Sequence, residues 1–165
     1  MKPAELIDLL QAFYQDKAGL RQRHVAAARR VVDYNFNNTY QYIINREDVQ
    51  LTWLRDALAA LGGAAPTDPA EPQIQARGKA AEAQASIVRD DRDSAQAFVD
   101  RWRDKVEKVT NARNKNMLRV ILGETLEARR FFDQMVTGRE DLLGRRADGA
   151  GTSGEVMATR WVGEP

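Results

Sequence analysis

The chain has 165 residues, of which 43% are hydrophobic and 30% are charged, and its formal net charge is +1. This length suits one domain with a substantial core, and the balanced charge provides no global field that would draw the chain to nucleic acid or acidic membranes. The absence of cysteine excludes a disulfide framework, a zinc ribbon and thiol catalysis. No apolar run has membrane-spanning length and the N-terminus is amphipathic, so we expect a cytoplasmic protein without a membrane partner.

Apolar residues spaced by three and four positions predict two helices in the first part of the chain, at about 4–32 and 38–61. Asn and Asp compete for backbone hydrogen bonds, so the segment 33–38, Asp-Tyr-Asn-Phe-Asn-Asn, is expected to form the break between them. The spacing assigns the inward face of the first helix to Leu6, Leu10, Phe13, Lys17, Leu20, His24, Ala27 and Val31. It assigns the inward face of the second to Tyr40, Ile44, Glu47, Leu51, Leu54, Leu58 and Leu61.

Residues 62–75 begin with Gly62-Gly63 and hold three of the five prolines, which predicts a linker. Two further helices follow at about 80–109 and 113–136. Their expected inward faces are formed by Gln84, Val88, Asp91, Ala95, Phe98 and Trp102 on the third helix, and by Met117, Ile121, Glu124, Ala128, Phe131 and Met135 on the fourth.

The bundle is therefore expected to occupy residues 1–138 and to be followed by a tail at 139–165. The tail contains Val156, Met157, Trp161 and Val162, and we expect it to lie against the bundle for that reason.

The lengths of the connections predict how the helices are arranged. Short corners after the first and third helices make two antiparallel pairs. The linker at 62–75 reaches about 45 Å when extended, and a helix of this size is about 40 Å long. We therefore predict an all-α four-helix bundle in which a long crossover linker leaves the second and third helices parallel.

One inward position of the second helix is a carboxylate. Glu47 lies among the leucines of the second helix, where a buried charge has to be paired, protonated or bound to a metal. Gln50 follows three residues later, and Glu124 and Glu127 repeat this spacing on the fourth helix.

The chain resembles the ferritin-like superfamily in this plan and in two segments, 45–58 (NREDVQLTWLRDAL) and 123–132 (GETLEARRFF). The resemblance implies a di-iron or manganese centre and ferroxidase, peroxidase or oxygen-activating chemistry, with Glu-x-x-His on the second and fourth helices. Glu47 and Glu124 match the acid positions, but Gln50 and Glu127 stand where the resemblance implies histidines. The metal site is therefore expected to be degenerate.

The first helix adds a second argument against a metal centre. Lys17, Arg21 and His24 are expected at the level of Glu47, where the resemblance implies another acid. We therefore expect no catalytic residue, no cofactor and no metal, and the candidate ligands in the alternative with iron or manganese are Glu47, Gln50, Glu124 and Glu127.

A basic group surrounds the corner between the third and fourth helices and consists of Arg101, Arg103, Lys105, Lys108, Arg113, Lys115 and Arg119. Because acids are interleaved with these residues, we do not expect nucleic acid as a partner. Two hypotheses about function stay open. The first is a structural or protein-interaction role, with an unknown protein partner or self-association and no enzymatic activity. The alternative is a carboxylate-rich, metal-binding oxidoreductase or iron-handling protein of the ferritin-like type.

Overall fold

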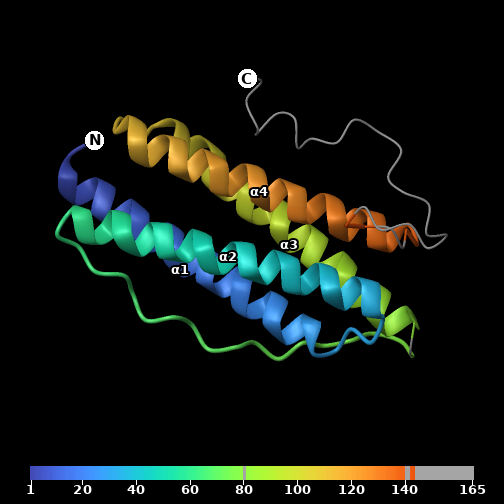
Figure 1. The fold of residues 1–165 in the computed structure, drawn as a ribbon. Helices are drawn as coiled ribbons and strands as arrows, with labels where there is room; N and C mark the ends of the chain where they lie inside the picture. Colours follow the sequence, from blue (N-terminus) through green and yellow to red (C-terminus); the bar gives the residue numbers. More distant parts are fainter. Residues whose placement is uncertain (80, 140–141, 144–165) are drawn as a thin grey trace, which may run out of the picture.

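The computed structural model describes residues 1–79, 81–139 and 142–143. These residues form four helices, α1 (Pro3–Ala28), α2 (Tyr34–Ala60), α3 (Ala81–Glu107) and α4 (Ala112–Val136), and no strand occurs among them (Figure 1). The helices pack against one another as a bundle, which confirms the predicted all-α four-helix architecture. No helix in the described ranges has both the length and the apolar character that crossing a membrane requires.

The start of α2 corrects the expected break at 33–38. The helix begins at Tyr34, because the Asp33 side chain caps it by accepting a hydrogen bond from the backbone N–H of Phe36 at 2.9 Å. Asn37 is accommodated in the first turn by donating its side-chain amide to the carbonyl of Ala28 at 2.7 Å. The polar residues of this segment therefore fasten the helix start to the end of α1 instead of interrupting the helix.

The other helix ends follow common capping chemistry. The Asn111 side chain accepts a hydrogen bond from the N–H of Asn114 at 3.0 Å and so caps the start of α4. Gly62 and Gly138 follow the last turns of α2 and α4 with φ of 77° and 78°, a left-handed conformation that glycine adopts without steric cost.

The helices are arranged as two pairs. The contacts between α1 and α2 and between α3 and α4 are the most extensive, and smaller interfaces between α1 and α3 and between α2 and α4 join the pairs. Figure 1 shows the two members of each pair running in opposite directions, whereas α2 and α3 run in the same direction.

The segment 61–79 connects the pairs and lies beside α1 (Figure 1). Gln11 near the start of α1 donates a hydrogen bond to the carbonyl of Ala64 at 2.8 Å. Arg29, just beyond the last residue of α1, forms an ion pair with Glu71 at 2.7 Å. These contacts, one near each end of α1, hold the segment against that helix.

The inward faces of the first three helices agree closely with the sequence analysis, but α4 is rotated. Leu54, Leu58, Phe98, Trp102 and Ile121 are buried as expected. The expected positions Met117, Glu124 and Phe131 are only partly buried, and each following residue, Leu118, Thr125 and Phe132, is buried instead. The reason is that α4 packs far more extensively on α3 than on α2, so its buried face turns toward α3.

The core consists of two apolar clusters. The first lies at the end of the bundle where α1 begins and contains Leu10, Phe13, Leu54, Phe98 and Trp102 among others. The second lies at the opposite end and includes Tyr40, Ile44, Val88, Phe132 and Leu142. Apart from the buried Leu142, the expectation that the tail lies against the bundle falls on residues 140–141 and 144–165, which are outside the described residues.

Candidate functional site

A layer of buried polar side chains separates the two apolar clusters. All four helices contribute to this polar layer, which we define as Lys17 and His24 from α1, Glu47 and Gln50 from α2, Asp91 from α3 and Thr125 from α4. Each of these side chains is almost completely buried. Since burying polar and charged groups is costly, their mutual contacts determine whether the layer is stable.

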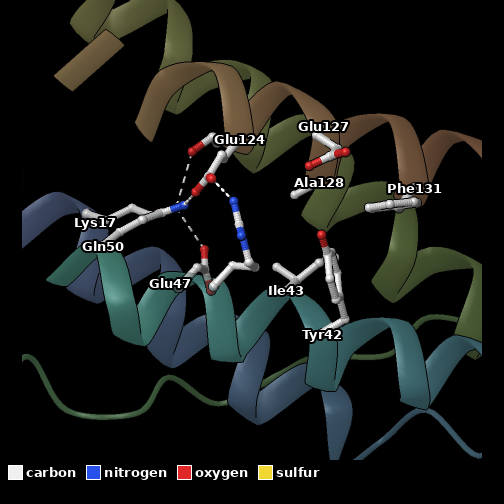
Figure 2. A pocket seen from close by; sticks show the side chains of 11 residues that line it. Lys17, Tyr42, Ile43, Glu47, Gln50, Glu124, Glu127, Ala128 and Phe131 are labelled. Carbon is white, nitrogen blue, oxygen red and sulfur yellow. Dashed lines mark hydrogen bonds and ion pairs between the residues drawn. The ribbon is translucent and has the colours of Figure 1, made fainter. Parts of the chain in front are cut away.

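Lys17 and Glu47 form the central contact of the layer. The Lys17 Nζ lies 2.9 Å from Glu47 Oε1 and donates a second hydrogen bond to Thr125 Oγ1 at 3.2 Å (Figure 2). Its third neighbour is the ring of Phe98, whose centroid lies 5.4 Å from Nζ and adds a cation–π contact. The ammonium of α1 thus links α2 and α4 through the middle of the bundle.

His24 engages the other oxygen of the same carboxylate. Its Nδ1 lies 2.9 Å from Glu47 Oε2, and because an ionised carboxylate only accepts hydrogen bonds, Nδ1 carries the proton. The His24 Nε2 is buried and has no hydrogen-bond partner within the described part of the chain, and the ring packs beside Phe132 at a centroid distance of 5.2 Å. Both Glu47 oxygens are therefore engaged by α1.

The electrostatic balance keeps Glu47 ionised. Burial alone raises the pKa of this carboxyl, but the charges of His24 and Lys17 and their hydrogen bonds outweigh burial and hold the pKa at about 2, below the usual 4.5. Lys17 and Glu47 consequently act as a buried ion pair at neutral pH.

A second buried carboxylate, Asp91, has its own partners. Tyr40 donates a short hydrogen bond to Asp91 Oδ2, and Arg23 Nε lies 2.6 Å from Asp91 Oδ1 without the alignment of a hydrogen bond. Burial raises the pKa of Asp91, and the nearby His24 and Arg23 only partly oppose this. Burial and the Asp91 charge also raise the pKa of Tyr40 well above 10. Asp91 is thus less well compensated than Glu47.

Glu124 lies at the outer edge of the polar layer, on the α4 side. Gln50 donates its amide to Glu124 Oε2 at 2.5 Å, and Arg46 forms an ion pair with the other oxygen (Figure 2). Glu127, one turn further along α4, is exposed. The two α4 acids therefore take no part in the contact between Lys17 and Glu47.

A small cavity of about 10 Å³ lies next to these side chains. Figure 2 shows its lining, in which Glu47 and Gln50 on α2 face Glu124 and Ala128 on α4, and Tyr42 lies across from Phe131. This volume is about that of one water-sized sphere. The Gln50 Oε1 is buried in this lining and finds no hydrogen-bond partner among the residues that the structure describes.

The donor set does not fit a di-metal centre. Lys17 Nζ occupies the space between Glu47 and Thr125, and both oxygens of Glu47 and of Glu124 are held by other side chains. Among the residues that the structure describes, no three His, Asp or Glu side chains come together as a metal-binding group.

The sequence-predicted residues are thus distributed over three places. Lys17 and His24 both contact Glu47 in the polar layer, whereas Gln50, which also belongs to the layer, donates its amide to Glu124 at the outer edge. Arg21, expected as a further partner of Glu47, points outward and forms an ion pair with Asp48 at 2.9 Å.

Two features of the polar layer and its contacts were not predicted. Thr125 was missed because the buried face of the fourth helix, which includes the predicted Ile121, Ala128 and Met135, is turned so that Thr125 faces inward in place of Glu124. The group formed by Arg23, Tyr40 and Asp91 was missed although Tyr40 and Asp91 were both assigned to inward faces. Their common inward position was the available signal, since a buried phenol and a buried acid each require a partner.

Comparison of the chain with protein-family models, with curated proteins and with solved structures gives no match.

Proposed function

We propose that this protein is a ferritin-like helical bundle without a complete di-iron site and that its role is structural or based on protein interaction. The observation that carries the proposal is the buried ion pair between Lys17 and Glu47 at 2.9 Å. A lysine ammonium there supplies the positive charge that a metal ion supplies in an active di-metal centre.

The electrostatics of the polar layer support a metal-free centre. Lys17 is 1% exposed and Glu47 is 2% exposed, so their charges interact in a medium that screens poorly. A divalent cation entering beside Glu47 would be repelled by the Lys17 ammonium and would displace the contact with His24. The ligands are thus both too few and already engaged.

The arrangement of the helices supports the ferritin-like part of the proposal. The segment 61–79 lies beside α1 between its contacts with Gln11 and Arg29, and α2 and α3 run in the same direction (Figure 1). In our proposal this segment is the long crossover connection of a ferritin-like bundle.

The space in the centre supports a role other than catalysis. The cavity beside Lys17 and Glu47 has a volume of about 10 Å³, whereas small-molecule sites occupy roughly 300–1,000 Å³.

Metal analysis tests the proposal. Protein purified from cells grown with added iron or manganese is assayed for metal by mass spectrometry and for oxygen-dependent oxidation of Fe²⁺. We expect substoichiometric metal and no oxidation above the buffer rate, both for the natural chain and for Glu47→Gln. The matched control is Glu107→Gln, which changes an exposed glutamate paired with Arg119. Stoichiometric iron or manganese that is lost in Glu47→Gln and kept in the control would overturn the proposal in favour of an iron-handling oxidoreductase.

A further inference from the structure

A hollow of about 260 Å³ lies between α1 and α3, and we call it the α1–α3 pocket. Its lining residues fall within 16–23 of α1 and 94–101 of α3, and none of them lines the central cavity. The volume lies just below the ~300–1,000 Å³ of small-molecule sites, in contrast to the central cavity of about 10 Å³. The pocket is therefore large enough for a small ligand.

Each end of the α1–α3 pocket has one arginine, Arg23 from α1 or Arg101 from α3. Arg101 reaches across to Asp16 on α1. Arg23 reaches across to Asp91 on α3. Asp16 and Arg23 are two helical turns apart on α1, which corresponds to about 10 Å along the helix axis. The two guanidinium groups thus belong to opposite ends of the pocket.

Arg23 has donors that the fold does not use. Its Nε lies 2.6 Å from Asp91 Oδ1 without the alignment of a hydrogen bond, and the other Asp91 oxygen accepts a hydrogen bond from Tyr40. Within the described part of the chain, the Arg23 Nη1 and Nη2 form no hydrogen bond, and the side chain is 25% exposed. Their N–H groups are therefore available to a ligand at this end.

Arg101 is used only in part as well. Its Nη1 lies 2.7 Å and 2.6 Å from the two oxygens of Asp16, which also accepts a hydrogen bond from Trp102 Nε1 at 2.7 Å. Among the described residues, the Arg101 Nε and Nη2 find no hydrogen-bond partner, and the side chain is 54% exposed. The second end of the pocket thus also presents unused guanidinium donors.

The middle of the pocket is apolar. Leu20 on α1 and Phe98 on α3 line it between the two arginines and are buried, whereas the neighbouring Ala97 is exposed. Gly19 contributes no side chain to the lining. Solvent therefore reaches an apolar surface that has a cation at each end.

We propose that the α1–α3 pocket binds an elongated small molecule with a carboxylate at each end and a hydrocarbon middle. One carboxylate contacts Arg23, the other contacts Arg101, and the hydrocarbon packs on Leu20 and Phe98. The planar fork of a guanidinium donates two parallel hydrogen bonds to a carboxylate, which a point charge does not. The lining carries two positive charges and the single negative charge of Asp16, so it attracts an anion.

The spacing of the arginines selects the length of the ligand. Each bond of ~1.5 Å adds about 1.25 Å to the length of an extended hydrocarbon chain. Seven such bonds separate the carboxyl carbons of suberate, which spans about 9 Å and matches the pocket. Succinate, with three bonds, spans about 4 Å and reaches one arginine at a time.

NMR titration of the full-length protein tests the proposal. The probes are suberate, succinate and octanoate, each added at the same ionic strength and pH. Octanoate has as many carbons as suberate but a single carboxylate, so it serves as the matched probe. We expect suberate to bind at least about fivefold more tightly than either of the others, because it alone engages both guanidinium groups.

Variants assign the binding to the pocket. Arg101→Gln should weaken suberate binding to the level of octanoate and leave octanoate binding unchanged. Arg119→Gln is the matched control, since Arg119 is an exposed arginine paired with Glu107, and it should change neither affinity. Ala97→Phe fills the pocket without changing its charge and should abolish the binding of both probes. Circular dichroism checks that each variant is folded.

The proposal is overturned if suberate causes no saturable shifts up to about 20 mM in the natural chain. Equal affinities for suberate and octanoate would also overturn it, because the second arginine would then contribute nothing. The same holds for equal losses in Arg101→Gln and Arg119→Gln, which would indicate general ion pairing at the surface. These outcomes are independent of the metal content measured for the proposed function.

Discussion

Glu47 and Leu54 lie two helical turns apart on the same face of α2, and both side chains are almost fully buried. Leu54 belongs to an apolar cluster in which any side chain of similar shape and volume finds favourable contacts. Glu47 is stable only because Lys17 and His24 each engage one of its oxygens. The stability of the apolar ends of the bundle therefore depends on side-chain volume, whereas the stability of the polar layer depends on the identity of individual partners.

Removing the cation should have the largest effect. Lys17→Met leaves the Glu47 carboxylate buried with His24 as its remaining partner, so we expect a loss of ~3–5 kcal/mol in the free energy of unfolding. Urea denaturation followed by circular dichroism measures this loss. A loss below about 1 kcal/mol would mean that the carboxylate is compensated in another way.

Removing side-chain volume from an apolar cluster should lower the free energy of unfolding by a similar or smaller amount. Leu54 is 0% exposed, and Leu54→Ala should lower the free energy of unfolding by ~2–5 kcal/mol through lost contacts and the cavity left behind. The same denaturation experiment measures it, and Leu54→Met, which conserves volume, is the control. A loss under about 1 kcal/mol for the alanine variant would contradict the burial of this face.

The buried apolar residues could be predicted from the sequence, whereas the contacts of the polar layer could be predicted only in outline. Three- and four-residue spacing identified Leu54, Phe98 and Ile121 because burial of apolar surface is non-directional and requires only the correct face. Spacing also placed Lys17 and His24 at the level of Glu47. It did not reveal which oxygen each would contact, because hydrogen bonds depend on ångström-scale geometry.

The rotation of α4 shows a second limit. Glu124 and Thr125 are neighbours in sequence, and only Thr125 enters the polar layer. Which of them faces inward depends on how strongly α4 packs on α3 compared with α2, and this is a property of three helices together. The start of α2 was similarly misplaced, because Asp33 caps a helix where its composition suggested a turn.

Acid titration separates the two buried carboxylates. The pKa of Glu47 is about 2 in the folded protein and about 4.5 in the unfolded chain, so its stabilising contribution is present above pH 4.5 and is lost as the pH falls toward 2. This loss amounts to ~3 kcal/mol, since one unit of pKa corresponds to about 1.4 kcal/mol. Glu47→Gln should remove this part of the acid dependence in denaturation curves recorded from pH 7 to pH 2.

Asp91 should behave in the opposite way and serves as the comparison. Burial raises its pKa in the folded protein, so protonation as the pH falls relieves a cost of folding. Asp91→Asn should therefore make the loss of stability in acid steeper than in the natural protein. If Glu47→Gln leaves the loss of stability below pH 4.5 unchanged, Glu47 is not the carboxylate whose charge stabilises the fold, and the account is contradicted.

An exposed ion pair should contribute least to the stability of the protein. Arg119 and Glu107 lie 2.6 Å apart, closer than Lys17 and Glu47, and the guanidinium holds the pKa of Glu107 at about 2. Both side chains are half exposed, so solvent and salt screen their interaction. Arg119→Ala should leave the denaturation midpoint unchanged within error at physiological salt. A shift of the denaturation midpoint as large as that of Lys17→Met would show that burial does not make the central ion pair more stabilising than the exposed one.

The most direct test of the central ion pair is a double-mutant cycle between Lys17 and Glu47. The unfolding free energies of Lys17→Met, Glu47→Gln and the combined variant are measured under identical conditions. Each single variant leaves a buried polar partner uncompensated, whereas the combined variant removes both charges, so we predict a coupling energy of ~2–3 kcal/mol and a double variant more stable than Lys17→Met alone. Losses that add within about 0.5 kcal/mol would show that the two residues do not stabilise each other and would contradict an ion pair at the centre of the bundle.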